Sequence, residues 1–253
     1  MTLDFLLSTV KPFGSAPLKG VLSSLNPGQF ERRVWETYGI SPNEGRYISI
    51  PGGMADYVSS LIMLDMLDRF FGEAGIELPQ NPKALDIGSE DWHYVAAIHK
   101  FLKVRSGSDN IQLDGIEYFG DDYKGTIDIK LRDLDGTTYT AGDIFEISIR
   151  PEYDIVFVMH PLGTEKAYGR WKIPFRPLDQ FWSRAMGSLK PGGILIGCGY
   201  LWCDGKKAFE YFPQDETILS KRYYSPLQRM HGINVFELRS FDDNIVMIAK
   251  KPG

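Results

Sequence analysis

The residues best suited to chemistry begin with a short acidic turn behind an apolar segment. Lys83 to Gly88 is typical of a strand that ends in a turn, and Ser89-Glu90-Asp91-Trp92 follows directly. Ligands of α/β sheets bind beyond the carboxyl ends of the strands, so this first strand-to-helix turn is where a ligand is expected. Gly88 suits a sharp turn that lets backbone approach a ligand. Ser89 or Asp91 is expected to cap the following helix.

Three carboxylates near this turn decide which ligands suit it. A dinucleotide would place its pyrophosphate at the helix N-terminus, where Glu90 and Asp91 would repel it. Glu117 ends the second predicted strand, where a carboxylate can accept hydrogen bonds from both hydroxyls of a ribose. The alternative for Glu117 is a solvated loop residue. The pattern favours a ligand that lacks a pyrophosphate or bears positive charge.

His160 is the candidate for proton transfer because it follows the fourth predicted strand. An imidazole titrates near neutral pH and can remove a proton from an acceptor hydroxyl or amine. The alternative is a histidine that only hydrogen-bonds a loop at the strand end. No metal site is expected, because the four histidines are scattered and the two cysteines have no standard zinc spacing.

The elements that must position these residues follow from the apolar pattern. Apolar residues at helical spacing predict a helix from Tyr57 to Ala74, although Asp68 interrupts its apolar stripe. From about residue 83, short apolar runs alternate with helix-length segments, which predicts β-α-β units and a mainly parallel sheet. Strands are predicted at 83–88, 111–119, 138–141, 153–159, 193–197, 234–241 and 244–250, and helices near 94–101 and 178–189.

Residues 126–136 fit two structures. Thr126 to Arg132 alternates as a strand does, and Asp135-Gly136 would then turn a hairpin. Tyr123, Ile127 and Leu131 also fit one helix face. A crossover between parallel strands is needed here, so a short helix is the preferred prediction.

Composition excludes several functional classes. The chain has 253 residues, 43% hydrophobic and 24% charged, with a net charge of −5 and no strongly basic half. A dedicated nucleic-acid binder is therefore not expected. No apolar run approaches the ~20 residues of a membrane span, and the N-terminus lacks the basic start of a signal peptide. A cytoplasmic protein without a membrane or nucleic-acid partner is expected.

Six stretches in order resemble the class I S-adenosylmethionine-dependent methyltransferases. The stretches are Leu85 to Gly88, Gly115 to Glu117, Ala141 to Asp143, Tyr153 to Phe157, Leu189 to Gly193 and Val246 to Lys251. The resemblance covers roughly residues 80–251. It implies a Rossmann-like, doubly wound α/β fold with a mostly parallel seven-stranded sheet and a reversed last strand. Residues 81–253 are then one compact domain, and residues 1–80 are an N-terminal helical or irregular extension or lid.

The resemblance also implies a role for each site residue, with S-adenosylmethionine as cofactor, a small molecule as methyl acceptor and no metal. Asp86, Gly88 and Ser89 would face the methionine part of the cofactor, and Glu117 would hold the ribose. Tyr118 would lie beside the adenine, and Asp143 with the Ile144 backbone would meet its amino edge. Met159 and His160 would border the transferring methyl.

The departures from the family pattern leave the function open. The family's turn continues with two further glycines, where this chain has Glu90 and Trp92. Their side chains would crowd the cofactor, or the loop takes another shape, or the site has lost its ligand. The second hypothesis is therefore a non-catalytic binding or scaffold protein of the same fold. A nicotinamide-dependent oxidoreductase is disfavoured by the acidic turn and the missing second glycine.

Two long connections carry aromatic and basic residues. Segments 163–177 and 200–230 lie after the fourth and fifth predicted strands. We expect them to form the wall of an acceptor pocket. The alternative is that these side chains pack within a cap over the domain or form a contact between subunits. In the second case the protein would be a homo-oligomer.

Overall fold

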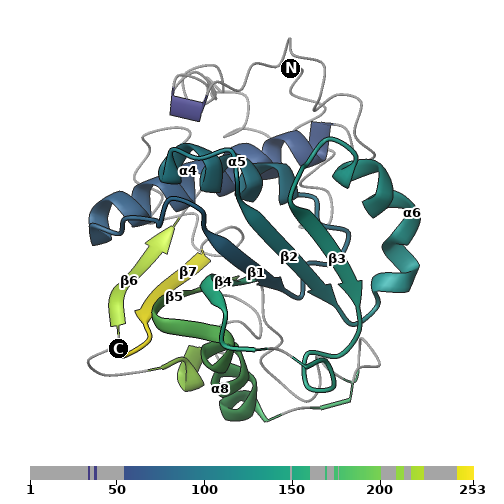
Figure 1. The fold of residues 1–253 in the computed structure, drawn as a ribbon. Helices are drawn as coiled ribbons and strands as arrows, with labels where there is room; N and C mark the ends of the chain where they lie inside the picture. The colour runs from purple at the N-terminus through teal and green to yellow at the C-terminus, as the bar shows by residue number, and fades with distance from the viewer. Residues whose placement is uncertain are drawn as a thin grey trace, which may run out of the picture.

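The computed structural model describes residues 34, 37–38, 54–148, 150–159, 169, 174–175, 177–200, 209–213, 218–224 and 244–253. These residues form an α/β fold in which one sheet separates two layers of helices (Figure 1). The predicted strand 234–241, His160 and most of the two aromatic connections lie outside this part of the chain. So do most of residues 1–53.

The sheet has seven strands in the order β3-β2-β1-β4-β5-β7-β6. Their bounds are β1 Lys83–Ile87, β2 Gln112–Glu117, β3 Thr137–Ala141, β4 Tyr153–Met159, β5 Leu189–Tyr200, β6 Ile218–Tyr224 and β7 Asn244–Lys250. The strands from β3 to β5 pair in parallel, whereas β7 pairs antiparallel with both β5 and β6. The mostly parallel sheet with a reversed last strand was predicted from the sequence.

The structure contains a strand that was not predicted, whereas the predicted strand 234–241 lies outside the described residues. The sixth strand is Ile218–Tyr224, inside the segment that was expected to connect strands five and six. The fifth strand is also longer than predicted and begins at Leu189. Its register against β4 shifts between Tyr153, opposite Leu189, and Ile155, opposite Ile194. Pro191 and Gly192 lie in this irregularity, and Gly192 has φ +78°, so the predicted loop is an irregular start of the strand.

Helices cover both faces of the sheet. Helices α4 Met54–Ala74, α5 Val95–Ser106 and α6 Gly120–Leu131 lie on one face, and α8 Leu178–Ser188 lies on the other (Figure 1). The α6 helix settles the ambiguous segment in favour of the predicted helix. Among the described helices, none is long and apolar enough to span a membrane.

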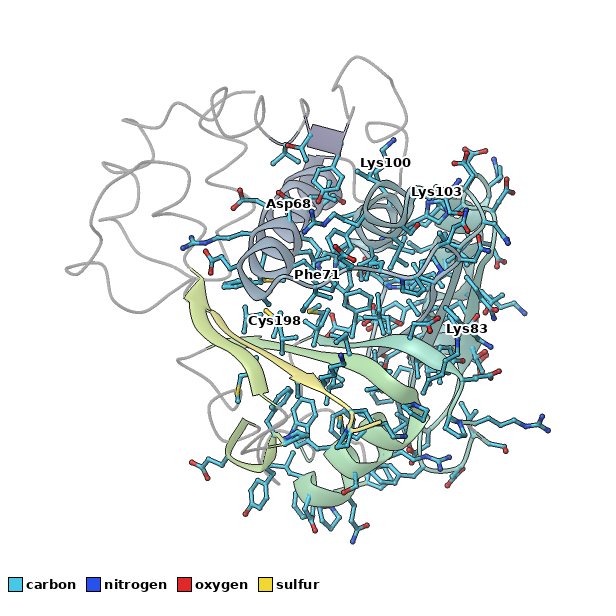
Figure 2. All side chains as sticks on the ribbon, turned by 60° about the vertical axis from the view of Figure 1, so that its left-hand side comes forward. Asp68, Phe71, Lys83, Lys100, Lys103 and Cys198 are labelled. Carbon is cyan, nitrogen blue, oxygen red and sulfur yellow. The ribbon has the colours of Figure 1, made fainter. Side chains whose placement is uncertain are left out.

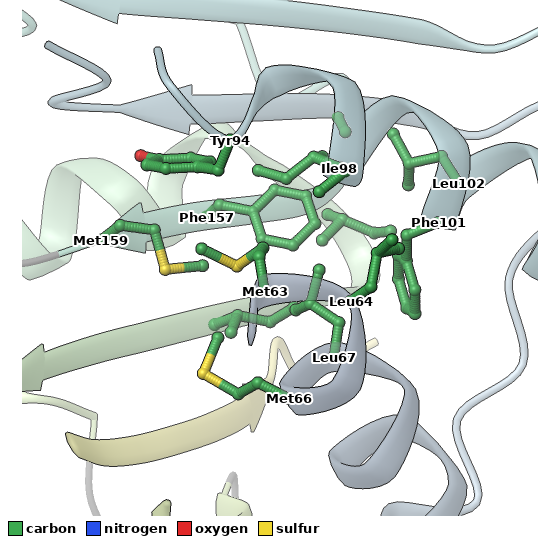
Figure 3. Packing of buried hydrophobic residues seen from close by; sticks show 14 of the residues in the cluster. Met63, Leu64, Met66, Leu67, Tyr94, Ile98, Phe101, Leu102, Phe157 and Met159 are labelled. Carbon is green, nitrogen blue, oxygen red and sulfur yellow. The ribbon is translucent and has the colours of Figure 1, made fainter. Parts of the chain in front are cut away.

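The larger core lies between the first helical layer and the sheet. Phe71 of α4 and Cys198 of β5 are both buried in this layer (Figure 2). Around them, Leu64 and Phe101 from the helices pack close to Phe157 of β4 (Figure 3). Central strand β4 is apolar towards both layers because helices cover both of its faces.

Asp68, which interrupts the apolar stripe of α4, has a structural partner. The hydroxyl of buried Tyr38 donates a hydrogen bond to Asp68 Oδ1 over 2.8 Å. Arg105 Nη1 of α5 lies 3.8 Å from the same oxygen. The carboxylate therefore joins α4 to a residue far away in the sequence and to the neighbouring helix.

Candidate functional site

The sheet register brings the predicted site residues to one edge. Ile87 of β1 is opposite Ile116 of β2 and Val158 of β4, and Glu117 is opposite Ala141 of β3. Gly88, Tyr118, Asp143 and Met159 therefore all lie at or just beyond the carboxyl ends of neighbouring strands, where this class of sheet binds ligands. The strand order reverses between β1 and β4, which is the switch point of the sheet.

The turn after β1 has left-handed backbone, which glycine adopts most easily, at three alternate positions. Gly88 has φ +76°, Glu90 has φ +50° and Trp92 has φ +51°. Left-handed backbone is uncommon for residues with a Cβ and costs about 1–2 kcal/mol per residue. Glu90 and Trp92 are the only non-glycine residues with positive φ in the described part of the chain. The loop therefore keeps the left-handed backbone at both positions where the family has glycine.

The Trp92 side chain points into the core and away from the sheet edge. Its indole is fully buried, and Nε1 donates to Asp86 Oδ2 over 2.7 Å. A Cβ added at Gly115, in the middle of β2, would lie 2.7–2.9 Å from three atoms of the indole. The ring of Tyr139 on β3 lies 5.7 Å from it. Trp92 thus packs in the core, on the sheet face over β2.

Glu117 fastens the turn to β2. Its Oε2 accepts a hydrogen bond from the backbone N–H of Glu90 over 2.9 Å, and Oε1 accepts one from Phe119 over 3.1 Å. A carboxylate has about four acceptor positions, so two further donors can still be accommodated. Only 6% of Glu117 is exposed. Hydrogen bonds from a ribose would therefore form at a carboxylate that is already held in place.

Asp86 and Ser89 carry buried oxygens without hydrogen-bond partners. Among the described residues, Asp86 Oδ1, Ser89 Oγ and Thr137 Oγ1 are the buried side-chain atoms of this kind. An unpaired buried polar atom costs about 1–3 kcal/mol, so two such atoms in one turn indicate a place for a ligand's donors. Burial raises the pKa of Asp86 to about 7, and the hydrogen bond from Trp92 only partly opposes this rise.

The turn is open above Gly88 and acidic beside it. A Cβ added at Gly88 would meet no atom within 4 Å. Loss of water around Glu90 raises the pKa of its carboxyl, as does the charge of nearby Glu117. The pKa of Asp91 is lowered to about 2, mainly by its hydrogen bond with His93. The local charge therefore favours a cationic ligand over an anionic one.

The remaining predicted residues lie farther along the same edge. Tyr118 is 38% exposed, and its ring contacts Phe119 edge to face. Asp143 Oδ1 accepts a hydrogen bond from the backbone of Phe145, while the Ile144 side chain is buried in the core on the α8 side. Met159 is buried beside Tyr94 (Figure 3). The position of His160 lies outside the residues that the structure describes.

The predicted helix cap was wrong. Helix α5 begins at Val95, its N-cap is Tyr94, and no side-chain hydrogen bond caps it. The helix begins at Val95, close to the predicted residue 94, and the turn before it continues through the left-handed residue Trp92. Ser89 and Asp91 therefore lie inside the turn and cannot cap the helix.

Sequence reasoning also missed three side chains that support the site. Lys130 of α6 donates to the carbonyl oxygen of Asp91 over 2.7 Å, and Tyr139 donates to that of Glu90 over 2.7 Å. Arg184 of α8 donates to the carbonyl oxygen of Ile144 over 3.1 Å. Lys130 follows buried Ile127 by three positions on one helix face, and this spacing was the only available signal. No group of three metal-ligating side chains is found among the described residues.

The order and direction of the strands in the sheet identify the fold. Strands β3-β2-β1-β4-β5 follow the order of a Rossmann-like sheet, and the reversed β7 inserted beside β5 is the feature expected of the methyltransferases. The chain has a Rossmann-like, methyltransferase-type fold.

Solved structures similar to this methyltransferase-type fold include three named methyltransferases. N-methyltransferase NodS from Bradyrhizobium japonicum, in complex with S-adenosyl-L-homocysteine, is 12% identical, with 89% of this chain and 98% of that chain covered and a TM-score of 0.49. Geranyl diphosphate C-methyltransferase from Streptomyces coelicolor is 10% identical, with 74% and 76% covered and a TM-score of 0.47. A SAM dependent methyltransferase from Aquifex aeolicus is 9% identical, with 89% and 98% covered and a TM-score of 0.47.

No family model matches the sequence, and no curated protein matches it. A fold of this kind does not define a reaction, because activity depends on the residues of the site.

Proposed function

We propose that this chain binds S-adenosylmethionine at the edge formed by β1, β2 and β3 and transfers its methyl group to a small-molecule acceptor. The observation that carries the proposal is the turn 88–92. Its three alternate residues keep left-handed backbone even though two of them are not glycine. Strained backbone of this kind persists where the surrounding structure enforces it, and it is concentrated at ligand sites.

The residues of the turn fit the amino-acid end of this cofactor. The open backbone at Gly88 gives access, and the unpaired oxygens Asp86 Oδ1 and Ser89 Oγ can accept hydrogen bonds from an ammonium group. The acidic residues Glu90 and Asp91 favour a ligand that carries an ammonium and a sulfonium. The same charges disfavour a pyrophosphate, which argues against a nicotinamide dinucleotide.

The rest of the edge would hold the nucleoside. Glu117 would accept the ribose hydroxyls with its remaining acceptor positions, and exposed Tyr118 would lie against the adenine. Asp143 and the backbone of Ile144 would meet the adenine amino edge, and Arg184 holds that loop from α8. When bound, the cofactor supplies an electrophilic methyl group on a sulfonium.

The protein contributes orientation and, by prediction, a proton acceptor. Buried Met159 ends β4 next to the switch point, and His160 follows it in the sequence. His160 stays a prediction for the residue that removes a proton from the acceptor. Holding the acceptor in line with the sulfonium is itself sufficient for catalysis in many transfers of this kind.

Calorimetric titration with S-adenosylmethionine and S-adenosylhomocysteine tests the proposal. We expect both ligands to bind, and we expect Glu117→Ala to weaken binding about tenfold or more because charged hydrogen bonds to the ribose are lost. Asp128→Ala, which removes an exposed carboxylate from α6, is the matched control and should bind as the wild type does.

Two results would contradict the proposal. If neither ligand gives a heat of binding at high micromolar concentration, the result would favour the non-catalytic scaffold. An unchanged affinity in Glu117→Ala would show that Glu117 does not hold the ribose.

A further inference from the structure

We infer that Trp92 and Lys130 are positioning residues for cofactor binding, which hold the turn 88–92 in the left-handed shape that glycines provide in the methyltransferase pattern. The inference rests on the proposed function. Neither side chain is expected to touch the cofactor, because both reach the turn from the core side.

Trp92 stabilises the turn from the core side through three contacts. The indole N–H donates to Asp86, which ties the last residue of the turn to β1. The absence of a side chain at Gly115 creates the space that the indole fills, since a Cβ there would overlap it at 2.7 Å. The backbone N–H of Trp92 donates to the Ser89 carbonyl over 2.8 Å. The buried, hydrogen-bonded indole thus fixes the left-handed backbone of Trp92, which is unfavourable for any residue with a Cβ.

Lys130 holds the middle of the same turn from α6. Its side chain is only 1% exposed, and Nζ lies 2.7 Å from the Asp91 carbonyl oxygen and 3.3 Å from Asp91 Oδ2. A lysine is rarely buried unless it is paired, so its position at this carbonyl is specific. With Asp91 held from α6 and Trp92 held from β1, the N–H of Glu90 is presented to Glu117. The two anchors therefore set the geometry of the carboxylate that would receive the ribose.

The experiment measures ligand affinity and local opening in two variants. Trp92→Phe keeps an aromatic ring but removes the N–H donor, and Lys130→Met keeps the stem but removes the ammonium. We expect each variant to bind S-adenosylhomocysteine about tenfold more weakly in calorimetric titration, because one charge-assisted hydrogen bond that fixes the turn is lost. We also expect amide hydrogen exchange at Glu90 to be about tenfold faster in both variants, measured by NMR.

Phe71→Leu is the matched control for a purely structural effect. Phe71 is fully buried in the same core as Trp92, and its ring contacts Phe101 of α5 edge to face. At a temperature where all variants are folded, Phe71→Leu should bind S-adenosylhomocysteine as the wild type does and leave exchange at Glu90 unchanged. Equal weakening in Phe71→Leu would overturn the inference, as would wild-type affinity in both Trp92→Phe and Lys130→Met.

Failure of the proposed function gives a different result. If the wild type binds neither S-adenosylhomocysteine nor S-adenosylmethionine, the cofactor proposal fails, while exchange at Glu90 still tests the anchoring. If exchange at Glu90 is the same in the wild type and in both variants, the inference is wrong whatever ligand binds. Lys130→Met keeps the test available should Trp92→Phe fail to fold.

Discussion

At the scale of single residues, the most informative feature is the mutual fit of Trp92 and Gly115. Trp92 replaces a glycine of the family pattern, yet its ring occupies the space over Gly115 on the next strand. The two positions are 23 apart in sequence (115 − 92) and belong to different elements. The structure therefore accommodates the large side chain through a small residue elsewhere, and the edge of the sheet stays open at Gly88.

Gly115→Ala should therefore destabilise the fold. The added methyl would overlap the indole, and overpacking of this kind costs about 1–3 kcal/mol in free energy of unfolding. Gly125→Ala is the matched control, because Gly125 lies exposed in α6 with no atom within 4 Å of an added Cβ. Alanine should stabilise that helix by about 0.5–1 kcal/mol. Urea unfolding measures both changes, and an unaltered midpoint in Gly115→Ala would contradict the packing described for Trp92.

Asp86 should make stability fall as the pH rises towards neutrality. Its pKa is raised from 3.8 to about 7 by burial, so the folded state binds more protons than the unfolded state between these values. The free energy of unfolding should therefore decrease from pH 4 to pH 7, on the order of 3 kcal/mol for this group. Asp86→Asn removes the titration. The difference in unfolding free energy between the wild type and Asp86→Asn, measured in urea across this range, should change with pH, and a constant difference would refute the assignment.

At the scale of elements, the sequence predicted those parts of the fold that are encoded locally. Strands β1 and β4 are short apolar runs that are buried in the sheet, and the helix α6 follows from the need for a parallel crossover. The sixth strand was missed because Ile218–Tyr224 has the polar centre Ser-Lys-Arg and gains its role only by pairing with β7. Partner choice between distant segments is not encoded in local periodicity.

The same distinction between locally encoded features and contacts of distant segments applies to the site. Asp86, Gly88 and Glu117 could be placed at one edge because parallel strands end together. The contact of Lys130 with Asp91 could not be predicted, since it depends on how α6 packs against β3. The direction of the Trp92 side chain depends likewise on Gly115. Residues at strand ends were therefore predictable, and residues that support them from other elements were not.

The link between Tyr38 and Asp68 should stabilise the position of α4. Tyr38 is 2% exposed, and its hydroxyl donates to the carboxylate over 2.8 Å. Tyr38→Phe should lower the free energy of unfolding by about 1 kcal/mol, because the carboxylate loses one donor but remains partly hydrated. Tyr211→Phe is the control, since Tyr211 is 53% exposed. Equal urea midpoints for Tyr38→Phe and Tyr211→Phe would show that the hydrogen bond contributes nothing to stability.

At the scale of the whole molecule, net charge and local charge act in the same direction. The chain carries −5, and its candidate site has three carboxylates, Glu90, Asp91 and Glu117, against the cation Lys130 that contacts Asp91. Asp91 is charged at neutral pH, and its hydrogen bond with His93 lowers its pKa further, to about 2. Ligands that carry phosphates are therefore disfavoured both on approach and at the site.

This charge should separate two adenosine-containing ligands, one without phosphate and one with a pyrophosphate, in a thermal unfolding experiment. S-adenosylhomocysteine at about 100 times its Kd should add about 2.7 kcal/mol to stability, which corresponds to roughly 5–10 °C in Tm for a chain of this size. NAD at the same concentration should leave Tm unchanged, because its pyrophosphate would meet Glu90 and Asp91. An equal or larger shift with NAD would show that the acidic turn does not select the ligand, and the preference for an S-adenosyl ligand over a dinucleotide would then have to be abandoned.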